Sequence, residues 1–226
     1  MKEQCFLVEG AKSVLELLDS GFQTKLVVGT TGFYQDYTIN IKKYDRLCRL
    51  ASESELAKTG TFSTNRDALA VVKMPKGSTQ INQQTDYILA LDAISNPGNL
   101  GTIIRVADWY GIQQILLSFD CADQYNPKVI NSSMGSFVRV RITRLNLGEF
   151  IKGTTLPVIG TYMEGKSLHE FKFPKKAIIL IGNESHGINR SFDDQVNYRV
   201  SIPRFGNAES LNAAIATAIV CDNLRN

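Results

Sequence analysis

The chain has 226 residues, of which 43% are hydrophobic and 21% are charged, and both values are ordinary for a globular protein. Its apolar runs are shorter than the roughly 18 residues that cross a bilayer, so the sequence predicts neither disorder nor membrane insertion. The formal net charge of +3 permits an anionic partner, but it is too small to identify a nucleic-acid-binding protein by itself.

The N-terminal stretch and the cysteines favour a cytoplasmic protein without a metal. The stretch MKEQCFLVEGAK contains acidic residues and no apolar run before a small-residue cleavage site, unlike a secretory signal. The 4 cysteines lie far apart with no Cys-x-x-Cys pair, and the chain has only 2 histidines. We therefore expect a cytoplasmic location, no disulfide framework and no metal site.

The first third of the chain alternates short apolar runs with helical patterns, which predicts a compact α/β unit. The expected strands are 5–8, 25–28 and 68–72, and the expected helices begin at Ala11 and cover 41–50 and 53–58. The polar stretch PKGSTQINQQT follows and has no apolar period, so residues 76–85 are predicted to form an interdomain linker.

Beyond residue 86, strands and helices alternate in the way typical of a parallel sheet with helices on both faces. The expected strands are 87–91, 114–117, 137–142, 157–162, 177–181 and 198–202. The last pattern, at 208–224, places Leu211, Ala214, Ile215 and Ala218 on one stripe and predicts an amphipathic helix.

Three segments place glycine and uncharged polar residues directly after a predicted strand, where open parallel sheets bind ligands. The first, LDAISNPGNLGTIIRVADWYG at 91–111, predicts a turn at Asn96 and a helix from about Asn99. Thr102, Arg105 and Trp109 share one face of this helix at helical spacing. Arg105 is therefore either a cation presented to a ligand or an ordinary solvated arginine.

The second segment, IILIGNESHGI at 178–188, runs from a buried strand into Gly182, Asn183, Glu184 and Gly187. Glycines allow a backbone to approach a ligand closely, and Glu184 offers an acceptor to a hydroxyl, an amine or a cation. A plain strand-to-helix turn with a glutamate favoured by the helix dipole would show the same pattern, so both interpretations stay open.

The third segment, VSIPRFGNAESLNAAIATAI at 200–219, is predicted to be a strand, a loop and a helix. Asn207, Glu209, Ser210 and Asn212 crowd the start of the helix, and a cap needs only one of them. None of the three segments contains a P-loop or the Gly-x-Gly-x-x-Gly fingerprint, which argues against a dinucleotide-dependent oxidoreductase.

Taken in this order, the segments resemble the signature motifs of the SpoU/TrmH-type RNA 2′-O-ribose methyltransferases of the SPOUT superfamily. The resemblance is carried by NPGNLGTIIRVAD, IGNESHG and IPRFGNAESLN, with support from NSSMGSF at 131–137. Through FLVEGAKSVLELL and ALAVVKMP, the first unit resembles the substrate-binding domain of that family, which is similar to ribosomal protein L30e.

The resemblance implies the fold class and the domain organisation. We expect an α/β chain with a small L30e-like RNA-binding domain at 1–75, the linker at 76–85 and a SPOUT methyltransferase domain at 86–226. In relatives, the C-terminal segment threads through a loop of the parallel sheet and forms a trefoil knot, a rare exception to the rule against knots. Relatives act as homodimers with motif helices packed across the interface, so a homodimer is expected.

The resemblance also implies that S-adenosyl-L-methionine is the cofactor and that the methyl acceptor is a ribose 2′-hydroxyl of tRNA or rRNA. The positions that match the cofactor-binding residues of the family are Thr161, Gly182, Asn183, Glu184, Gly187, Ile202 and Leu211. The positions that match its catalytic or RNA-facing residues are Asn99, Arg105, Glu184, Ser210 and Asn212.

The chemistry of arginine limits what Arg105 can do. A guanidinium stays protonated in proteins, so it is a poor general base. We expect Arg105 to stabilise the developing alkoxide and to hold the adjacent phosphate. The residues leave open which group accepts the proton, and whether Arg105 serves its own chain or a partner chain.

Two other functions remain open from the residues alone. One is a non-catalytic RNA-binding or ribosome-binding protein of the same fold, against which the intact Asn99, Arg105, Glu184 and Asn212 argue. The other is a base methyltransferase of the same superfamily. His186 is expected to be a loop residue, and the sequence does not choose between tRNA and rRNA.

Overall fold

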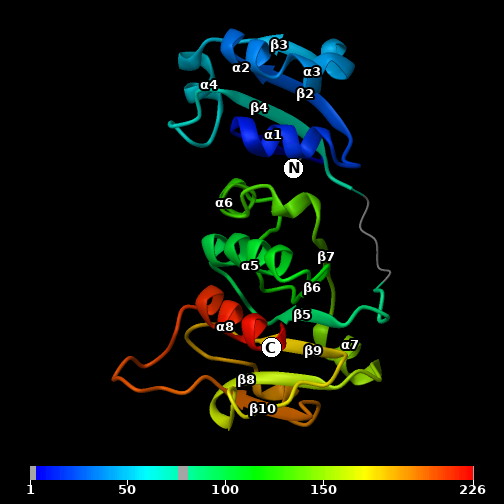
Figure 1. Ribbon diagram of the computed structural model, residues 1–226, viewed down its shortest axis with the longest axis vertical. Helices are drawn as coiled ribbons and strands as arrows, with labels where there is room; N and C mark the ends of the chain where they lie inside the picture. The colour runs from blue at the N-terminus through cyan, green and yellow to red at the C-terminus, as the bar shows by residue number, and fades with distance from the viewer. Residues whose placement is uncertain (1–3, 76–80, 226) are drawn as a thin grey trace.

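The computed structural model describes residues 4–75 and 81–225, which form two α/β units stacked along the long axis of the molecule (Figure 1). The N-terminal unit contains a 4-stranded sheet in the order β1-β4-β2-β3. The C-terminal unit contains a 6-stranded sheet in the order β10-β8-β9-β5-β6-β7. Within the described residues, no helix is both long enough and apolar enough to span a membrane.

The N-terminal unit is a small mixed sheet with short helices. Its elements are β1 (Cys5–Glu9), α1 (Ala11–Leu18), β2 (Thr24–Gly29), α2 (Thr31–Asp36), α3 (Thr38–Ile41), the 3-10 helix η1 (Lys42–Leu47), β3 (Cys48–Leu50), α4 (Glu53–Thr59) and β4 (Ala68–Lys73). The helix expected over 41–50 is wrong in its last three residues, because Cys48–Leu50 pairs with β2 as a parallel edge strand, and the preceding Lys42–Leu47 is a 3-10 helix. This pairing overrides a helical spacing of apolar residues.

The C-terminal unit confirms the expected parallel sheet. Its strands are β5 (Tyr87–Leu91), β6 (Gln114–Leu117), β7 (Arg141–Arg144), β8 (Val158–Ser167), β9 (Ala177–Ile181) and β10 (Tyr198–Ser201). Its helices are α5 (Pro97–Trp109), α6 (Pro127–Ser132), α7 (Leu147–Gly153) and α8 (Ala213–Arg225), with 3-10 helices η2 (Ser136–Val138) and η3 (Arg190–Phe192). Every pairing between neighbouring strands of this sheet is parallel.

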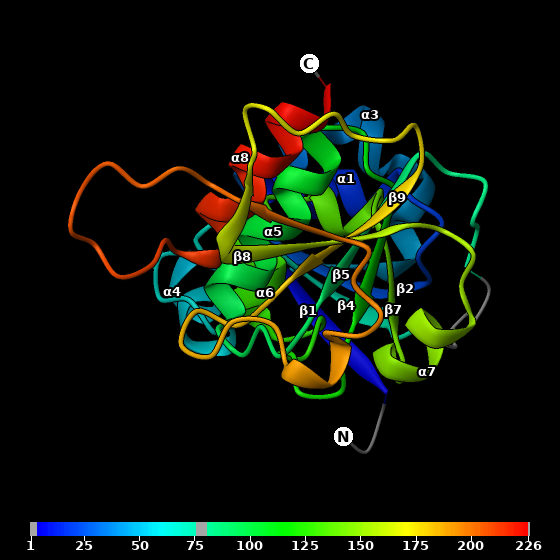
Figure 2. The same ribbon diagram turned by 90° about the horizontal axis from the view of Figure 1, so that it is seen from below.

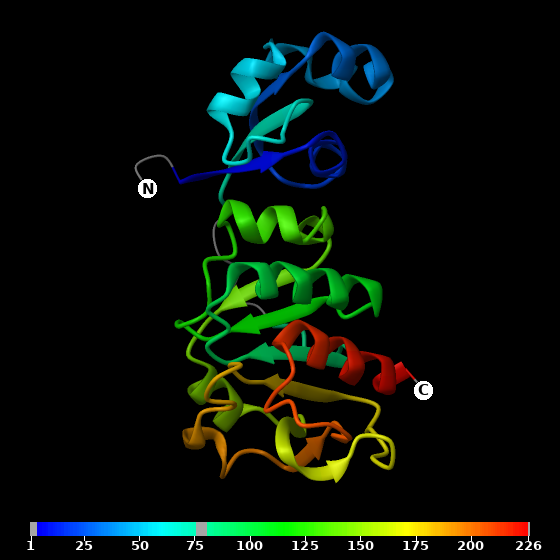
Figure 3. The same ribbon diagram turned by 90° about the vertical axis from the view of Figure 1, so that its left-hand side faces the viewer.

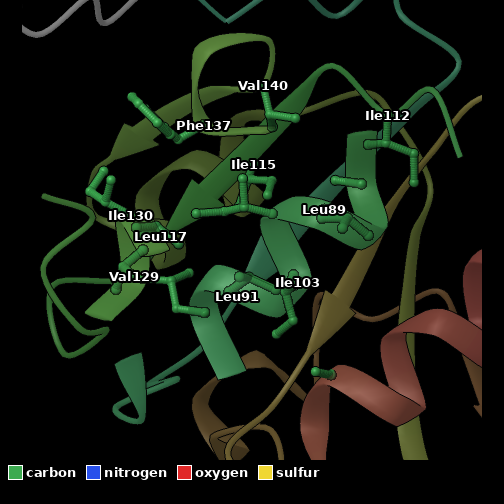
Figure 4. Packing of buried hydrophobic residues seen from close by; sticks show 14 of the residues in the cluster. Leu89, Leu91, Ile103, Ile112, Ile115, Leu117, Val129, Ile130, Phe137 and Val140 are labelled. Carbon is green, nitrogen blue, oxygen red and sulfur yellow. The ribbon is translucent and has the colours of Figure 1, made fainter. Parts of the chain in front are cut away.

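The two central strands, β5 and β9, are buried along their whole length. Because alternate residues of a strand point to opposite faces, Leu89 and Leu91 pack against α5, α6 and α8, whereas Ile88 and Ala90 pack against α7. Figure 3 shows α6, α5 and α8 one below the other on the same side of the molecule. A view of the first cluster shows Leu89 and Leu91 among side chains of α5, β6 and α6 (Figure 4).

Three expected boundaries in this unit are wrong for identifiable reasons. The strand expected from Phe137 begins at Arg141, and Phe137 itself lies in η2, buried against the N-terminal unit. Strand β8 continues to Ser167 because it also pairs with β10. Helix α8 begins at Ala213 and not at 208, since the side chain of Asn212 caps it.

Part of the expected linker can be placed. Residues 76–80 lie outside the described residues. Asn82 is held to the C-terminal unit, because its N–H donates to Gln114 Oε1 at 2.9 Å and its carbonyl oxygen accepts from Gln114 Nε2 at 2.7 Å. Ile81 packs against the apolar cluster on the α7 face of the sheet.

Gly101 of α5 lies directly against α6, which supplies a test of the packing of these two helices. A Cβ atom at Gly101 would lie 2.5 Å from the carbonyl oxygen of Val129 and 2.6 Å from Cβ of Ser132. We expect Gly101→Ala to lower the free energy of unfolding by about 1–3 kcal/mol, as overpacking does. Urea unfolding followed by circular dichroism measures this change.

The matched control is Gly148→Ala in α7, where the nearest atom to an added Cβ is 3.4 Å away. Alanine is a better helix former than glycine, so this variant should be unchanged or more stable by up to about 1 kcal/mol. Equal effects of the two substitutions would contradict the close packing of α5 on α6.

Candidate functional site

Three segments that leave the C-terminal sheet line one cavity of about 1090 Å³. They are 161–164 of β8, the loop 181–188 after β9 and most of the loop 202–211 that joins β10 to α8. Figure 2 shows this last loop standing out from the sheet. The inner wall is completed by small and apolar residues of α8, which are Ala213, Ala216 and Val220.

The structure brings together most of the residues that the sequence singled out. The positions matched to the cofactor all line the cavity, namely Thr161, Gly182, Asn183, Glu184, Gly187, Ile202 and Leu211. Of the positions matched to catalysis or RNA, Glu184 and Ser210 line the cavity, whereas Asn99, Arg105 and Asn212 lie outside its lining.

The loop after β9 closes on itself. The N–H of Asn183 donates to the carbonyl of Gly187 at 3.0 Å, and the N–H of Gly187 donates back to the carbonyl of Asn183 at 2.8 Å. Gly187 adopts a φ of +68°, and a Cβ atom on Gly182 would overlap the backbone of Gly187. Glycine is therefore needed at 182 because the loop folds back over it, and at 187 because of the left-handed conformation.

This loop is tied to the loop that follows β5. Asn183 Nδ2 donates to the carbonyl of Ala93 at 2.8 Å, and Asp92 Oδ2 accepts the N–H of Asn189 at 2.8 Å. Asp92 is only 6% exposed, and burial raises the pKa of its carboxyl group despite this hydrogen bond. Sequence reasoning missed Asp92, and its only signal is an acidic residue directly after a fully apolar strand.

A chain of side-chain hydrogen bonds joins one residue from each of the three motifs. Asn99 Nδ2 donates to Glu184 Oε1, and Asn99 Oδ1 accepts from Asn212 Nδ2 at 2.9 Å. Asn212 Oδ1 then accepts the N–H groups of Ala214 and Ile215 at 3.0 and 3.3 Å, which caps α8. Of the four polar residues at the start of this helix, Asn212 is thus the cap, and it also joins the hydrogen-bond network.

Arg105 lies apart from this network. It is exposed on α5 and does not line the cavity, and its side chain forms no hydrogen bond or ion pair within the described parts of the chain. Trp109, one turn further along α5, is 82% exposed, and Ile215 of the neighbouring helix α8 is 53% exposed. Ser210 and His186 are exposed loop residues at the cavity.

A cluster that the sequence did not reveal forms another part of the cavity wall. Tyr162 donates to Asp193 at 3.1 Å, and Arg199 pairs with Asp193 at 3.0 Å while lying 4.6 Å from the centre of the Tyr162 ring. Burial and the neighbouring Asp193 raise the pKa of Tyr162 to about 12, so the phenol stays protonated at neutral pH. These residues meet only because β8 and β10 pair, and residue spacing gives no signal of that contact.

Comparison with known proteins gives a consistent result. The family model described as the SpoU rRNA Methylase family matches residues 86–222. The chain is 31% identical over 230 residues to the 23S rRNA (guanosine(2553)-2'-O)-methyltransferase RlmP of Bacillus subtilis, covering 99% of this chain and 90% of that protein.

Solved structures agree over both units. The AdoMet-bound rRNA methyltransferase of Sinorhizobium meliloti matches with a TM-score of 0.85 and 27% identity, over 99% of this chain and 88% of that one. The SpoU methyltransferase AviRb of Streptomyces viridochromogenes, in complex with the cofactor AdoMet, matches with a TM-score of 0.82 and 25% identity, over 99% and 90%. The motif resemblance is confirmed, and the chain belongs to the SpoU rRNA methylase family.

Proposed function

We propose that this chain is an S-adenosyl-L-methionine-dependent enzyme that methylates a ribose 2′-hydroxyl of ribosomal RNA. The observation that carries the proposal is the convergence of the three motif segments on one cavity, with Asn212, Asn99 and Glu184 hydrogen-bonded in series beside it. The choice of ribosomal RNA over tRNA is supported by the B. subtilis relative, which is a 23S rRNA methyltransferase.

The cavity fits this cofactor in size and in chemistry. Its volume of about 1090 Å³ is at the upper end of ligand pockets, which leaves space for a nucleotide beside the cofactor. Ile188, Ile202 and Leu211 offer apolar surface to an adenine, and Glu184 and Glu209 offer negative charge near a sulfonium. Bound S-adenosyl-L-methionine supplies an activated methyl group on a positively charged sulfur.

The residues of the chain position the acceptor and stabilise charge. Asn99 holds the Glu184 carboxylate in one orientation, and Asn212 in turn holds Asn99. A site that places donor and acceptor in line can contribute about 7–11 kcal/mol to a bimolecular transfer. Arg105 keeps its proton, so its role is to stabilise the alkoxide that develops on the ribose oxygen and to hold the adjacent phosphate.

The proposal includes a homodimer in which Arg105 completes the site of the partner chain. Arg105 does not line the cavity of its own chain, and its guanidinium has no partner among the described residues. Large exposed apolar side chains on the same side of α5 and on α8, Trp109 and Ile215, favour an interface there. A two-fold dimer through these helices would present Arg105 to the other cavity.

The proposal also includes the finer features of the fold. Strand β10 is at the edge of the sheet, yet the chain returns past β8 and β9 to pack α8 on α5, as a trefoil knot requires. The unit before residue 76 carries the L30e-like motifs and would grip the RNA, and the unit after residue 85 would carry the transfer. An enzyme of this kind acts in the cytoplasm, where ribosomal RNA is.

Two measurements test the proposed function together. Isothermal titration of the chain with S-adenosyl-L-methionine should show binding, whereas a protein that binds only RNA should give no heat. An unmodified 23S rRNA transcript incubated with methyl-labelled cofactor should, after digestion to nucleosides, carry the label on ribose. A label on a base would show a base methyltransferase, and binding without any label would contradict catalysis on this RNA.

Gly182→Val should weaken the binding of S-adenosyl-L-methionine and raise its Kd by at least about tenfold. The added side chain overlaps Gly187 and must displace the loop that lines the cavity. Gly153→Val at the end of α7, where an added Cβ meets no atom within 4 Å, is the control. An unchanged Kd in a Gly182→Val protein with a normal melting curve would remove this loop from the cofactor site.

Arg105→Ala should lower kcat by about 100-fold or more, as loss of one charge-stabilising donor does, and leave the Kd of the cofactor within about threefold. A large loss of cofactor affinity would contradict the role assigned to Arg105.

Coexpression of Arg105→Ala with Gly182→Val tests whether Arg105 acts in the partner's site. In a mixed dimer, the intact cavity of the first chain would receive the intact Arg105 of the second, so activity should return. If the two inactive chains stay inactive together in a purified mixed dimer, Arg105 acts within its own chain.

Asn212→Asp separates capping from the hydrogen-bond network. Aspartate caps a helix as well as asparagine does, so the free energy of unfolding should stay within about 0.5 kcal/mol. It cannot donate to Asn99, so kcat should fall by about tenfold. Asn212→Ala should lose activity and about 1 kcal/mol of stability, and full activity of Asn212→Asp would show that the network is dispensable.

A further inference from the structure

The two units of the molecule share one apolar core. The ring of Phe6 in β1 lies 4.7 Å from that of Tyr125 and 6.1 Å from that of Phe137, centre to centre, and the ring of Phe22 lies 5.9 Å from that of Phe137. Helix α1 faces α6 across this junction (Figure 1). Apolar contacts of this kind hold the units together, but they are non-directional and do not fix one orientation.

Directional contacts at the junction come from Arg139. Its Nη1 lies 2.8 Å from Glu16 Oε2 on α1, and its Nη2 lies 2.8 Å from Asp108 Oδ2 on α5. Its Nε also donates to both carboxylate oxygens of Asp108, at 3.1 and 2.9 Å. One planar guanidinium therefore bridges a carboxylate of each unit, in the geometry in which arginine is most directional.

The backbone conformation at Gly135 allows Glu16 to reach Arg139. Gly135 adopts a φ of +91°, and a Cβ atom there would overlap the Glu16 carboxylate, so glycine is what allows Glu16 to approach. The hydrogen bonds that Arg139 donates to the carboxylates of Asp108 and Glu16 raise its pKa. Burial raises the pKa of Asp108, but the hydrogen bonds from Arg139 and Ser136 outweigh this effect and lower it.

The bridge ends on the helix that carries the site. Asp108 lies three residues after Arg105 on α5, and Asn99 lies in the first turn of the same helix. We propose that Arg139 is a positioning residue that holds the N-terminal unit at one orientation to α5 and so determines which nucleotide of a bound RNA reaches the cavity. This inference rests on the proposed function and deepens it, because it assigns the choice of nucleotide to the junction between the units.

The ion pairs of Arg139 are better suited to fixing the orientation of the two units than to raising the stability of the fold. The side chain of Arg139 is 45% exposed, and ion pairs at that exposure add little to the free energy of folding. The shared aromatic core remains when the bridge is removed, so a variant should fold and stay docked while its units sample more than one orientation.

Arg139→Ala tests the proposal against Arg141→Ala, its matched control. Arg141 is an exposed arginine of β7 that forms no ion pair with any residue in 4–75 or 81–225. On an unmodified 23S rRNA transcript, Arg139→Ala should raise KM at the wild-type nucleotide at least threefold, with kcat within twofold. Ribose methylation should also spread to further nucleotides, while the Kd of S-adenosyl-L-methionine stays unchanged.

Arg139→Lys should be intermediate, because an ammonium group cannot bond both carboxylates as a planar fork does. Small-angle X-ray scattering tests the orientation of the two units without any RNA. The distribution of interatomic distances obtained from it should be broader for Arg139→Ala than for the wild type. An unchanged KM, nucleotide and scattering profile would overturn the proposal, as would equal effects of Arg141→Ala. If the wild type itself transfers no methyl group, the proposed function fails, and scattering still decides whether Arg139 orients the units.

Discussion

A carboxylate can only accept hydrogen bonds, and the Glu184 carboxylate sets the direction of the network that crosses the three motifs. Asn99 must turn its amide nitrogen toward Glu184, so its oxygen faces Asn212, whose nitrogen must donate. The oxygen of Asn212 is then left to cap α8. One carboxylate thereby fixes two amide orientations and the start of a helix that lines the cavity, so these groups are already in place before a ligand binds.

A second set of constraints joins the loops that follow β5 and β9. Asn183 bonds the backbone of Ala93, and the buried Asp92 accepts from the backbone of Asn189. Burial of the Asp92 carboxylate disfavours its charged form, as its raised pKa indicates. Its structural role is therefore to hold the loop after β9 against the loop after β5. The loop that lines the cavity is consequently held from both ends and closed by its own backbone hydrogen bonds.

The two α/β units are packed against each other in this structure and share one apolar core. Phe137 belongs to a segment of the C-terminal unit, yet its ring packs on Phe6 and Phe22 of the N-terminal unit. Arg139 follows two residues later and adds the directional contact that aromatic packing lacks. The segment that includes NSSMGSF and Arg139 thus lies at the junction, where it contacts both the N-terminal unit and helix α5 of the C-terminal unit.

The sequence determined the central strands, because buried parallel strands read as continuous apolar runs, and β5, β6 and β9 match the predicted residues. It also pointed to the segments after β9 and β10 that line the cavity, since glycine and polar residues follow these two strands, and the family resemblance supplied the individual positions. Tertiary structure decided what spacing cannot encode: Phe137 is apolar for an interdomain contact and not for a strand, and Asn212 bonds Asn99 from 113 residues away. Such contacts depend on which elements meet in space, and local periodicity carries no record of that.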